Sequence, residues 1–476
     1  MIIILLKMKK IYYLFSVVFA WFSTSMLYAQ EKTADVLARF SSEAPVHWAV
    51  STKEGRLDLE WRPRQNSLSQ EGFRSFVAYY EGVFSGSISL SSNSFSGEIW
   101  HEGHTYFLTD EKGLLRVSPS QGAASCATCQ EGDCDIRPSS QVLSRGTILA
   151  EESLPSDDKR VLYNVHVLRT FRLAMLIDYS FYKGHCQGRM ELAKAFMVDV
   201  QTKLNEVCGR ELGYQFELVD DPRLIRDTKG KEVYPDKPLV RTVVNTATDT
   251  FNKLIGEENY DAGIVFSVYK DNRGLAHLGE ITGKLKGGCV ANEEFYIILH
   301  ELGHLLGSAH TFTIGGATAS SFTEPDRGNS IMSYINDPYG TYFSLPSIYT
   351  IHNRTNLHDA YYADKERTQL VGLAQPNIPY GEPSDNKAPM IDRSKLKKSY
   401  TLPPNTYFQF TIEARDPDGD PLLYMAHQAD FKVFGKARFP SDRPTTNNKI
   451  AFYRPYTKDN NTNEWKEVPY KFTGEY

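Results

Sequence analysis

Short apolar runs alternate with amphipathic segments through the middle of the chain, from about residue 161 to residue 310. The runs FRLAMLI and AGIVF are almost continuously apolar, which is typical of strands buried on both faces. Between them, apolar residues recur at helical spacing over 187–206, LGYQFELVD alternates like a strand, and 243–255 again has helical periodicity. This order of strand, helix and strand predicts crossover units.

The two flanking segments have a different pattern. Residues 30–158 contain short alternating runs such as GSISL, SGEIWH and TYFLT, which predict a β-rich domain ending in a Ser-, Pro- and charge-rich linker. Residues 375–476 begin with the Pro-rich linker PNIPYGEPSDNKAP and continue as strand, acidic turn and strand, which suits an immunoglobulin- or cadherin-like β-sandwich. The expected fold class is α+β, with a central domain over 159–374 between two β-rich domains.

The first 29 residues have the pattern of a secretory signal peptide. Lys7, Lys9 and Lys10 precede an apolar run from residue 11 to about residue 22, and small and polar residues follow up to Ala29. We expect cleavage after Ala29, so the mature protein would not span a membrane and would be secreted or held at the cell surface. The alternative is an uncleaved anchor helix, although the run is shorter than the roughly 20 residues that span a bilayer.

Length and composition limit the class of protein. The chain has 476 residues, which predicts two to four domains. Apolar residues make up 41% of it and the formal net charge is -5, as in a soluble globular protein. Because Lys and Arg are spread along the chain without a basic cluster, nucleic acid is not an expected partner.

The segment HELGH carries the strongest chemical signal in the chain. Residues four apart lie on one face of a helix, so His300 and His304 can bind one metal ion while Glu301 projects beside them. The segment continues as LLGSAH, in which Gly307 can end the helix and turn His310 back as a third nitrogen ligand. Three protein ligands leave one position for water, as a catalytic zinc site requires.

The extended motif HExxHxxGxxH is the signature of the metzincin clan of zinc endopeptidases, and this sequence resembles it at every defined position. The segments RLAML, NYDAGIVFS, GLAHLG and HELGHLLGSAHTF together resemble the bacterial reprolysin-like, adamalysin-related metallopeptidases over about residues 161–356. The resemblance implies a peptidase domain at 159–374 with a twisted, mostly parallel sheet and long helices. It also implies a zymogen with residues 30–158 as its propeptide, followed after the peptidase by a β-sandwich.

In metzincins a tight turn after the third histidine holds a methionine beneath the metal, and the segment SIMSY at 330–334 resembles this turn. The resemblance makes Met332 a packing residue. Tyr334 would be either a switchable metal ligand and transition-state donor or a packed turn residue. Adamalysin-type enzymes have an aspartate after the third histidine, where this chain has Thr311, so the supporting role of that carboxylate is unassigned.

The same resemblance implies a mechanism and a substrate-binding strand. Zinc would lower the pKa of its water to about 7 and polarise the scissile carbonyl, while Glu301 moves a proton from the water to the leaving amine. An extended substrate would pair with an edge strand. That strand consists of Gly274, Leu275, Ala276, His277, Leu278 and Gly279. A strand without a substrate role is the alternative, and His277 is expected at the surface rather than at the metal.

Three cysteines lie in the linker after the first β-rich segment, at Cys126, Cys129 and Cys134. Many metzincin propeptides block the zinc with a cysteine thiolate, and one of these three could do so. The alternatives are a local disulfide with one partner elsewhere, or a small structural zinc site.

The other three cysteines lie in the central domain. Cys186 and Cys208 flank the predicted helix, which separates them by roughly 30 Å, too far for a disulfide. This favours a bridge between Cys208 and Cys289.

Two further motifs have competing interpretations. Asp416, Asp418 and Asp420 in RDPDGDP could bind calcium between sandwich strands, or could simply form a solvated hairpin turn. The segment HEGH, from His101 to His104, has the wrong spacing for the peptidase motif and is predicted to be a turn.

The sequence therefore favours a secreted zinc endopeptidase made as a zymogen, with proteins or peptides as substrates. One alternative is an adhesin or binding protein whose peptidase domain is inactive, although Glu301 and all three histidines are present. The other is a zinc enzyme that acts on a non-peptide amide or ester.

Overall fold

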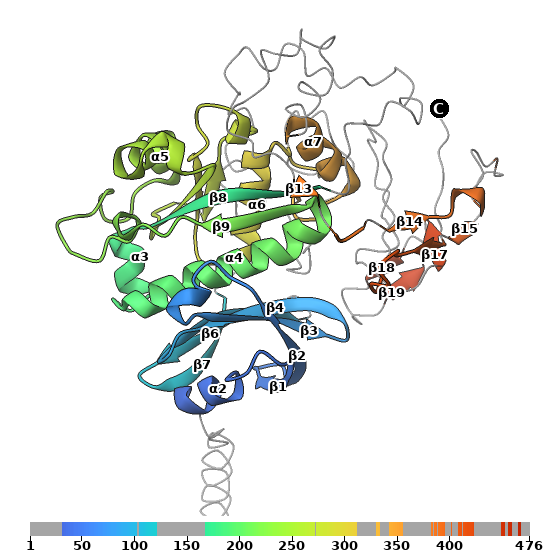
Figure 1. Cartoon of the computed structure of the whole chain (residues 1–476), viewed down its shortest axis with the longest axis horizontal. Helices are drawn as coiled ribbons and strands as arrows, with labels where there is room; N and C mark the ends of the chain where they lie inside the picture. The colour runs from blue at the N-terminus through green and yellow to red at the C-terminus, as the bar shows by residue number, and fades with distance from the viewer. Residues whose placement is uncertain are drawn as a thin grey trace, which may run out of the picture.

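The computed structural model describes residues 31–311 apart from 102–103, 121–166 and 272, together with 330–333, 342–355 and short stretches between 382 and 467 (Figure 1). The predicted signal peptide, the three linker cysteines Cys126, Cys129 and Cys134, and Tyr334 lie outside the described residues. Within the described ranges, no helix is long and apolar enough to cross a bilayer.

The N-terminal domain is an antiparallel meander of seven strands that pair in sequential order. Its strands are β1 (Val46–Ser51), β2 (Arg56–Arg64), β3 (Arg74–Tyr80), β4 (Val83–Leu90), β5 (Phe95–His101), β6 (His104–Glu111) and β7 (Leu114–Pro119). Successive side chains of a strand point to opposite faces, so on β3 Phe76 packs into the core under helix α2 (Thr33–Arg39) while Val77 packs into the core of the next domain. The middle strands β3, β4 and β5 are thus buried on both faces.

The central domain is built on a mixed sheet of six strands. They are β8 (Val167–Ile177), β9 (Tyr214–Leu218), β10 (Ala262–Phe266), β11 (Gly274–Ala276), β12 (Cys289–Ala291) and β13 (Glu382–Pro383). The order is β11-β12-β10-β8, and both β9 and β13 pair with β8. Strands β8, β9, β10 and β12 are parallel, whereas β11 and β13 are antiparallel to their neighbours, in agreement with the predicted mostly parallel sheet.

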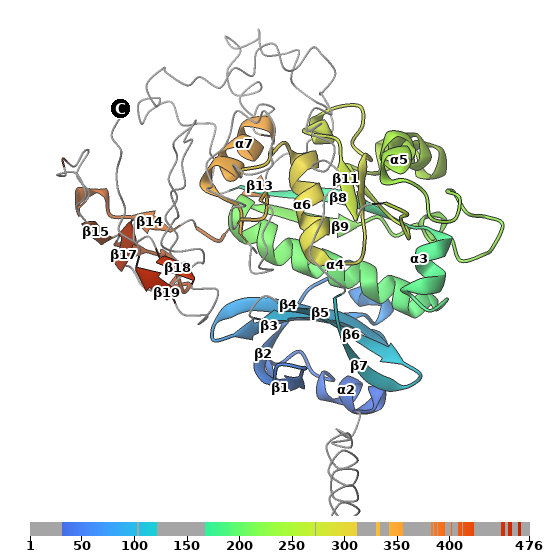
Figure 2. The same cartoon turned by 180° about the vertical axis from the view of Figure 1, so that it is seen from behind.

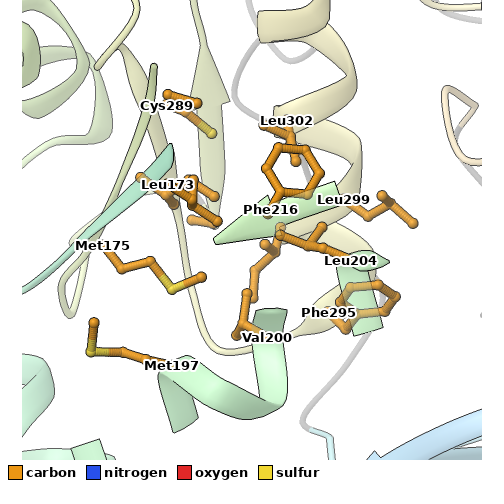
Figure 3. Packing of buried hydrophobic residues seen from close by; sticks show 14 of the residues in the cluster. Leu173, Met175, Met197, Val200, Leu204, Phe216, Cys289, Phe295, Leu299 and Leu302 are labelled. Atoms are coloured by element: carbon orange, nitrogen blue, oxygen red, sulfur yellow. The ribbon is translucent and has the colours of Figure 1, made fainter. Parts of the chain in front are cut away.

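Helices cover both faces of this sheet. On one face lie α4 (Met190–Leu212) and α6 (Phe295–Leu306), whose Leu204 and Leu302 belong to the same hydrophobic core as Met175 of β8 (Figure 3). On the other face α5 (Val240–Ile255) packs against Leu176, the next residue of β8. The remaining helices are α3 (Tyr179–Gly184) and α7 (Leu345–Thr355). Helix α4 lies between the central sheet and the N-terminal sheet (Figures 1 and 2).

The predicted disulfide between Cys208 and Cys289 is wrong. Cys208 lies near the end of α4, which packs on β9, whereas Cys289 begins β12. Strands β8 and β10 lie between β9 and β12 in the sheet, which places three strand spacings, about 14 Å, between the two positions. The thiols of Cys186, Cys208 and Cys289 form no disulfide with one another, and burial raises the pKa of the Cys208 thiol.

The described C-terminal residues form three separate two-stranded pairs. The pairs are β14 (Met390–Ile391) with β16 (Ala414–Arg415), β15 (Phe408–Thr411) with β17 (Lys449–Phe452), and β18 (Tyr456–Lys458) with β19 (Trp465–Glu467). The complete β-sandwich stays a prediction.

The acidic segment after β16 has the hydrogen bonds of a turn. The Asp416 carboxylate accepts the backbone N–H groups of Asp418 and Asp420 at 2.8 and 3.2 Å, and Asp418 accepts the backbone N–H of Lys387 at 2.6 Å. These three aspartates are not among the side chains that converge as a metal-binding group within the described ranges. The contacts favour the turn interpretation over a calcium site.

Candidate metal centre

The HELGH segment lies on α6, as its spacing predicts. Every residue of this helix except Tyr296 is buried, because its apolar side chains pack into the main core of the domain. The helix ends at Gly307, whose φ of 117° is in the left-handed region that favours glycine. The chain turns back there, and the Ser308 N–H donates to the Gly303 carbonyl at 3.0 Å.

The turn brings three imidazoles together. The Nε2 atoms of His300, His304 and His310 lie 3.1, 3.1 and 3.0 Å from one another, and all three side chains are buried. They are the only group of three or more potential metal ligands among the residues that the structure describes. An ion at the 2.0–2.1 Å typical of zinc–imidazole bonds, about 2 Å from each nitrogen, can contact all three.

The hydrogen bonds of the rings fix their tautomers. The Nδ1 of His300 lies 2.6 Å from the Ile331 carbonyl, and the Nδ1 of His304 lies 2.8 Å from the Ser308 carbonyl. A carbonyl oxygen only accepts, so the Nδ1 atoms of His300 and His304 donate, and in a singly protonated ring this leaves the lone pair on Nε2. Lone pairs that face one another at this distance repel unless a cation lies between them. The donor set therefore fits a metal ion such as zinc.

Main-chain carbonyls orient two of the rings, a role that carboxylates often take. Thr311, which stands where adamalysin-type enzymes have an aspartate, has a different structural role. Its backbone N–H and its hydroxyl both donate to the Met332 carbonyl, at 3.2 and 3.3 Å, and so connect the chain after His310 to the methionine turn. The supporting carbonyls of Ile331 and Ser308 could not be found from the sequence, because every residue has a carbonyl and no residue type marks a site that depends on one.

Met332 is fully buried in the core beneath α6. The turn is closed by Ser333, whose backbone N–H donates to the Ser330 carbonyl at 3.0 Å and whose hydroxyl donates to it at 2.6 Å. The Met332 sulfur packs directly against the Cα of Gly303, where any Cβ would overlap it. The glycine of HELGH thus lets the turn approach the helix that carries two of the histidines.

Glu301 is fully buried beside the three histidines. Strand β11, the last strand in the sheet order, packs over it. A Cβ on Gly274 would lie only 2.6 Å from the Glu301 Cγ and 2.7 Å from its Oε1, so only glycine leaves room for this carboxylate. At the other end of the predicted edge strand, the Gly279 N–H donates to the His304 carbonyl at 2.8 Å.

The edge segment differs from the prediction in two respects. Regular strand pairing covers only Gly274–Ala276 and ends before Leu278, which is half-buried. His277 is buried and not at the surface. Its backbone N–H donates to the Gly288 carbonyl at 2.9 Å, and its side chain turns inward. Burial lowers the pKa of His277, which favours the neutral ring, and its ring is not part of the histidine cluster.

Two imidazoles and a buried glutamate on one helix, joined by a third imidazole from the segment after it, form a site typical of metal-dependent hydrolases. Residues 167–344 match the reprolysin-type model of Metallo-peptidase family M12. Over these residues the central domain is similar to the reprolysin-like metallopeptidases.

Comparison with solved structures gives weaker similarities. Metalloproteinase-II from Bacteroides fragilis aligns with 10% identity and a TM-score of 0.40, over 68% of this chain and 96% of that chain. A structure described as a chaperone-substrate complex aligns with 10% identity and a TM-score of 0.29, over 57% of this chain and 39% of that chain. No curated protein matches the sequence.

Proposed function

We propose that this protein is a secreted bacterial zinc endopeptidase made as a zymogen. In this proposal His300, His304 and His310 hold the metal and Glu301 is the general base. The family match supports metallopeptidase activity, and the convergence of three Nε2 atoms within 3.1 Å beside a buried glutamate is the observation that carries the proposal.

When bound, zinc supplies electrophilic activation of the peptide carbonyl and of water. Glu301 takes a proton from the attacking water and delivers it to the leaving amine. Glu301 follows the ligand His300 on α6, and its side chain packs against Gly274 of β11. An extended substrate pairs with the main chain of β11, which is the terminal strand of the sheet order.

The remaining parts of the proposal rest on the sequence. They are signal-peptide cleavage after Ala29, a propeptide role for residues 30–158, and latency through a thiolate of Cys126, Cys129 or Cys134. Tyr334 is a candidate transition-state donor on the same grounds. Mass spectrometry of the secreted protein would identify both cleavage sites.

Removal of the metal is the direct test. We expect a zinc chelator to abolish casein hydrolysis by the full chain after proteolysis of its connecting segment, and one equivalent of zinc to restore it. Circular dichroism would show that the chelated protein is still folded. Activity that survives metal removal would contradict the zinc mechanism, whereas a folded, zinc-loaded but inert protein would favour a binding function.

The close contact between Gly274 and Glu301 gives a second prediction. We expect Gly274→Ala to bind zinc normally but to lower kcat at least tenfold, because its Cβ would lie 2.6 Å from the Glu301 Cγ and displace the carboxylate. Gly209→Ala on α4 is the control, since a Cβ there would approach other atoms no closer than 3.8 Å. Equal rates for the two variants would show that β11 does not position Glu301.

A further inference from the structure

The N-terminal sheet contacts the metal-binding helix at its first residue. The N-terminal N–H groups of a helix have no partner within the helix, and Glu294, at the cap position of α6, makes no side-chain capping bond. The partner comes from another domain. Both carboxylate oxygens of Glu98, on β5, lie 3.2 Å from the backbone N of Phe295. A carboxylate in this place caps the helix and complements its dipole.

A buried ion cluster holds Glu98 in position. The Glu98 Oε2 lies 2.6 Å from the Nζ of Lys203 on α4. The same Nζ lies 2.8 Å from the Oδ2 of Asp199, one helical turn earlier on α4. Ser87 of β4 donates to Asp199. All four side chains are buried, so each polar group needs the partner it has.

Burial raises the pKa of the Glu98 carboxyl to about 7, and the charge of Lys203 opposes this rise. The Glu98 carboxyl therefore protonates more readily than an exposed glutamate and can be charged or neutral. Each state keeps an oxygen that can accept the Phe295 N–H. The capping bond does not depend on the charge of Glu98.

The Phe295 ring is held from the same strand. Trp100, two residues after Glu98 on β5 and so on the same face, stacks on Phe295 with ring centres 5.9 Å apart and planes 13° apart. The Lys203 Nζ lies 5.1 Å from the centre of the Phe295 ring. Of these three contacts of Phe295, those from Glu98 and Trp100 thus come from the N-terminal sheet.

Further contacts between the two domains lie along α4. They include Arg64 with Glu206, Ser67 with Gln201, Glu71 with Lys194, and Asp110 with Arg189 just before the helix. Apolar residues of the N-terminal sheet, including Val77 and Phe84, belong to the same hydrophobic core as α4 and α6. At a rise of 1.5 Å per residue, Phe295 lies about 8 Å along the helix axis before His300. The N-terminal sheet can therefore act on the metal centre through α6.

We propose that the N-terminal sheet positions the metal-binding helix through Glu98 and Trp100, so that residues 31–119 form a structural part of the metal centre and not only a propeptide. Glu98 and Trp100 are positioning residues in this arrangement. The proposal rests on α6 being the metal-binding helix, as in the proposed function, but it requires no particular substrate.

Amide hydrogen exchange of the metal-free full chain tests the proposal without relying on activity. We expect Glu98→Ala to speed exchange of the amides of Phe295–Ile298 roughly tenfold and to raise the zinc Kd roughly tenfold, since it removes the cap of the ligand helix. Glu98→Gln keeps an accepting oxygen and should stay within about twofold of the wild type. Ser87→Ala is the matched control, because it disturbs the same ion cluster without a contact to α6.

Glu98→Ala and Ser87→Ala with the same exchange rates and zinc affinity would overturn the proposal. If Glu98→Ala does not fold, Trp100→Leu gives an independent measurement. Loss of the stacked ring should speed exchange at Phe295 while leaving the ion cluster intact, and unchanged exchange would again overturn the proposal. A protein that shows these effects but hydrolyses no peptide would contradict only the proposed function.

Discussion

Glu301→Gln is expected to lower the kcat/KM for casein at least about 1,000-fold while zinc stays bound, since general acid–base catalysis contributes about 10²–10⁴ in rate. Glutamine has nearly the same shape as glutamate, so it fits the space between α6 and Gly274, where the glutamate side chain is fully buried. It cannot accept a proton from water. Because the histidines are unchanged, the zinc content should stay at one ion per chain. Initial rates and elemental analysis on the same sample measure both quantities.

Glu293, two residues before α6, provides a matched control. Glu293→Gln makes the same chemical change at a half-buried position outside the metal group and should keep nearly the wild-type rate. Removing a buried carboxylate relieves the cost of its desolvation, so the melting temperature of the metal-free Glu301→Gln variant should not fall. A variant that keeps more than about a tenth of the activity would exclude Glu301 as the general base.

The three histidine ligands could be predicted from the sequence because one helix and the turn that follows it bring them together. Helical periodicity places His300 and His304 on one face, and Gly307 marks the helix end that turns His310 back. Buried strands such as β8 and β10 were also predicted, since parallel strands covered on both faces are continuously apolar.

The contacts that could not be predicted from the sequence are either long-range or involve the main chain. Asp199 and Lys203 have the residue types of a solvated helix face, yet both are buried because a sheet from 100 residues earlier in the chain covers them. The Cys208–Cys289 prediction failed for the same reason, because periodicity does not give the order of strands in a sheet. Carbonyls that orient histidines leave no signal in the sequence at all.

His310→Ala is expected to raise the zinc Kd at least about 100-fold and to abolish activity, because a tetrahedral catalytic site needs three protein ligands. His310 is the ligand that does not lie on α6, so its removal leaves the helix and its two histidines in place. Zinc at 1,000 times the wild-type Kd should stabilise the wild type by about 4 kcal/mol, and the variant by about 1.4 kcal/mol if its Kd is 100-fold higher.

Thermal unfolding with and without zinc measures this difference, and isothermal titration gives the Kd of each protein. His104→Ala is the control, because His104 begins β6, where it pairs with His101 of β5, and its side chain is 53% exposed. It should keep both the wild-type affinity and the full zinc-dependent rise in melting temperature. A His310→Ala variant that binds zinc as tightly as His104→Ala would remove His310 from the metal centre and leave the site with only the two ligands of α6.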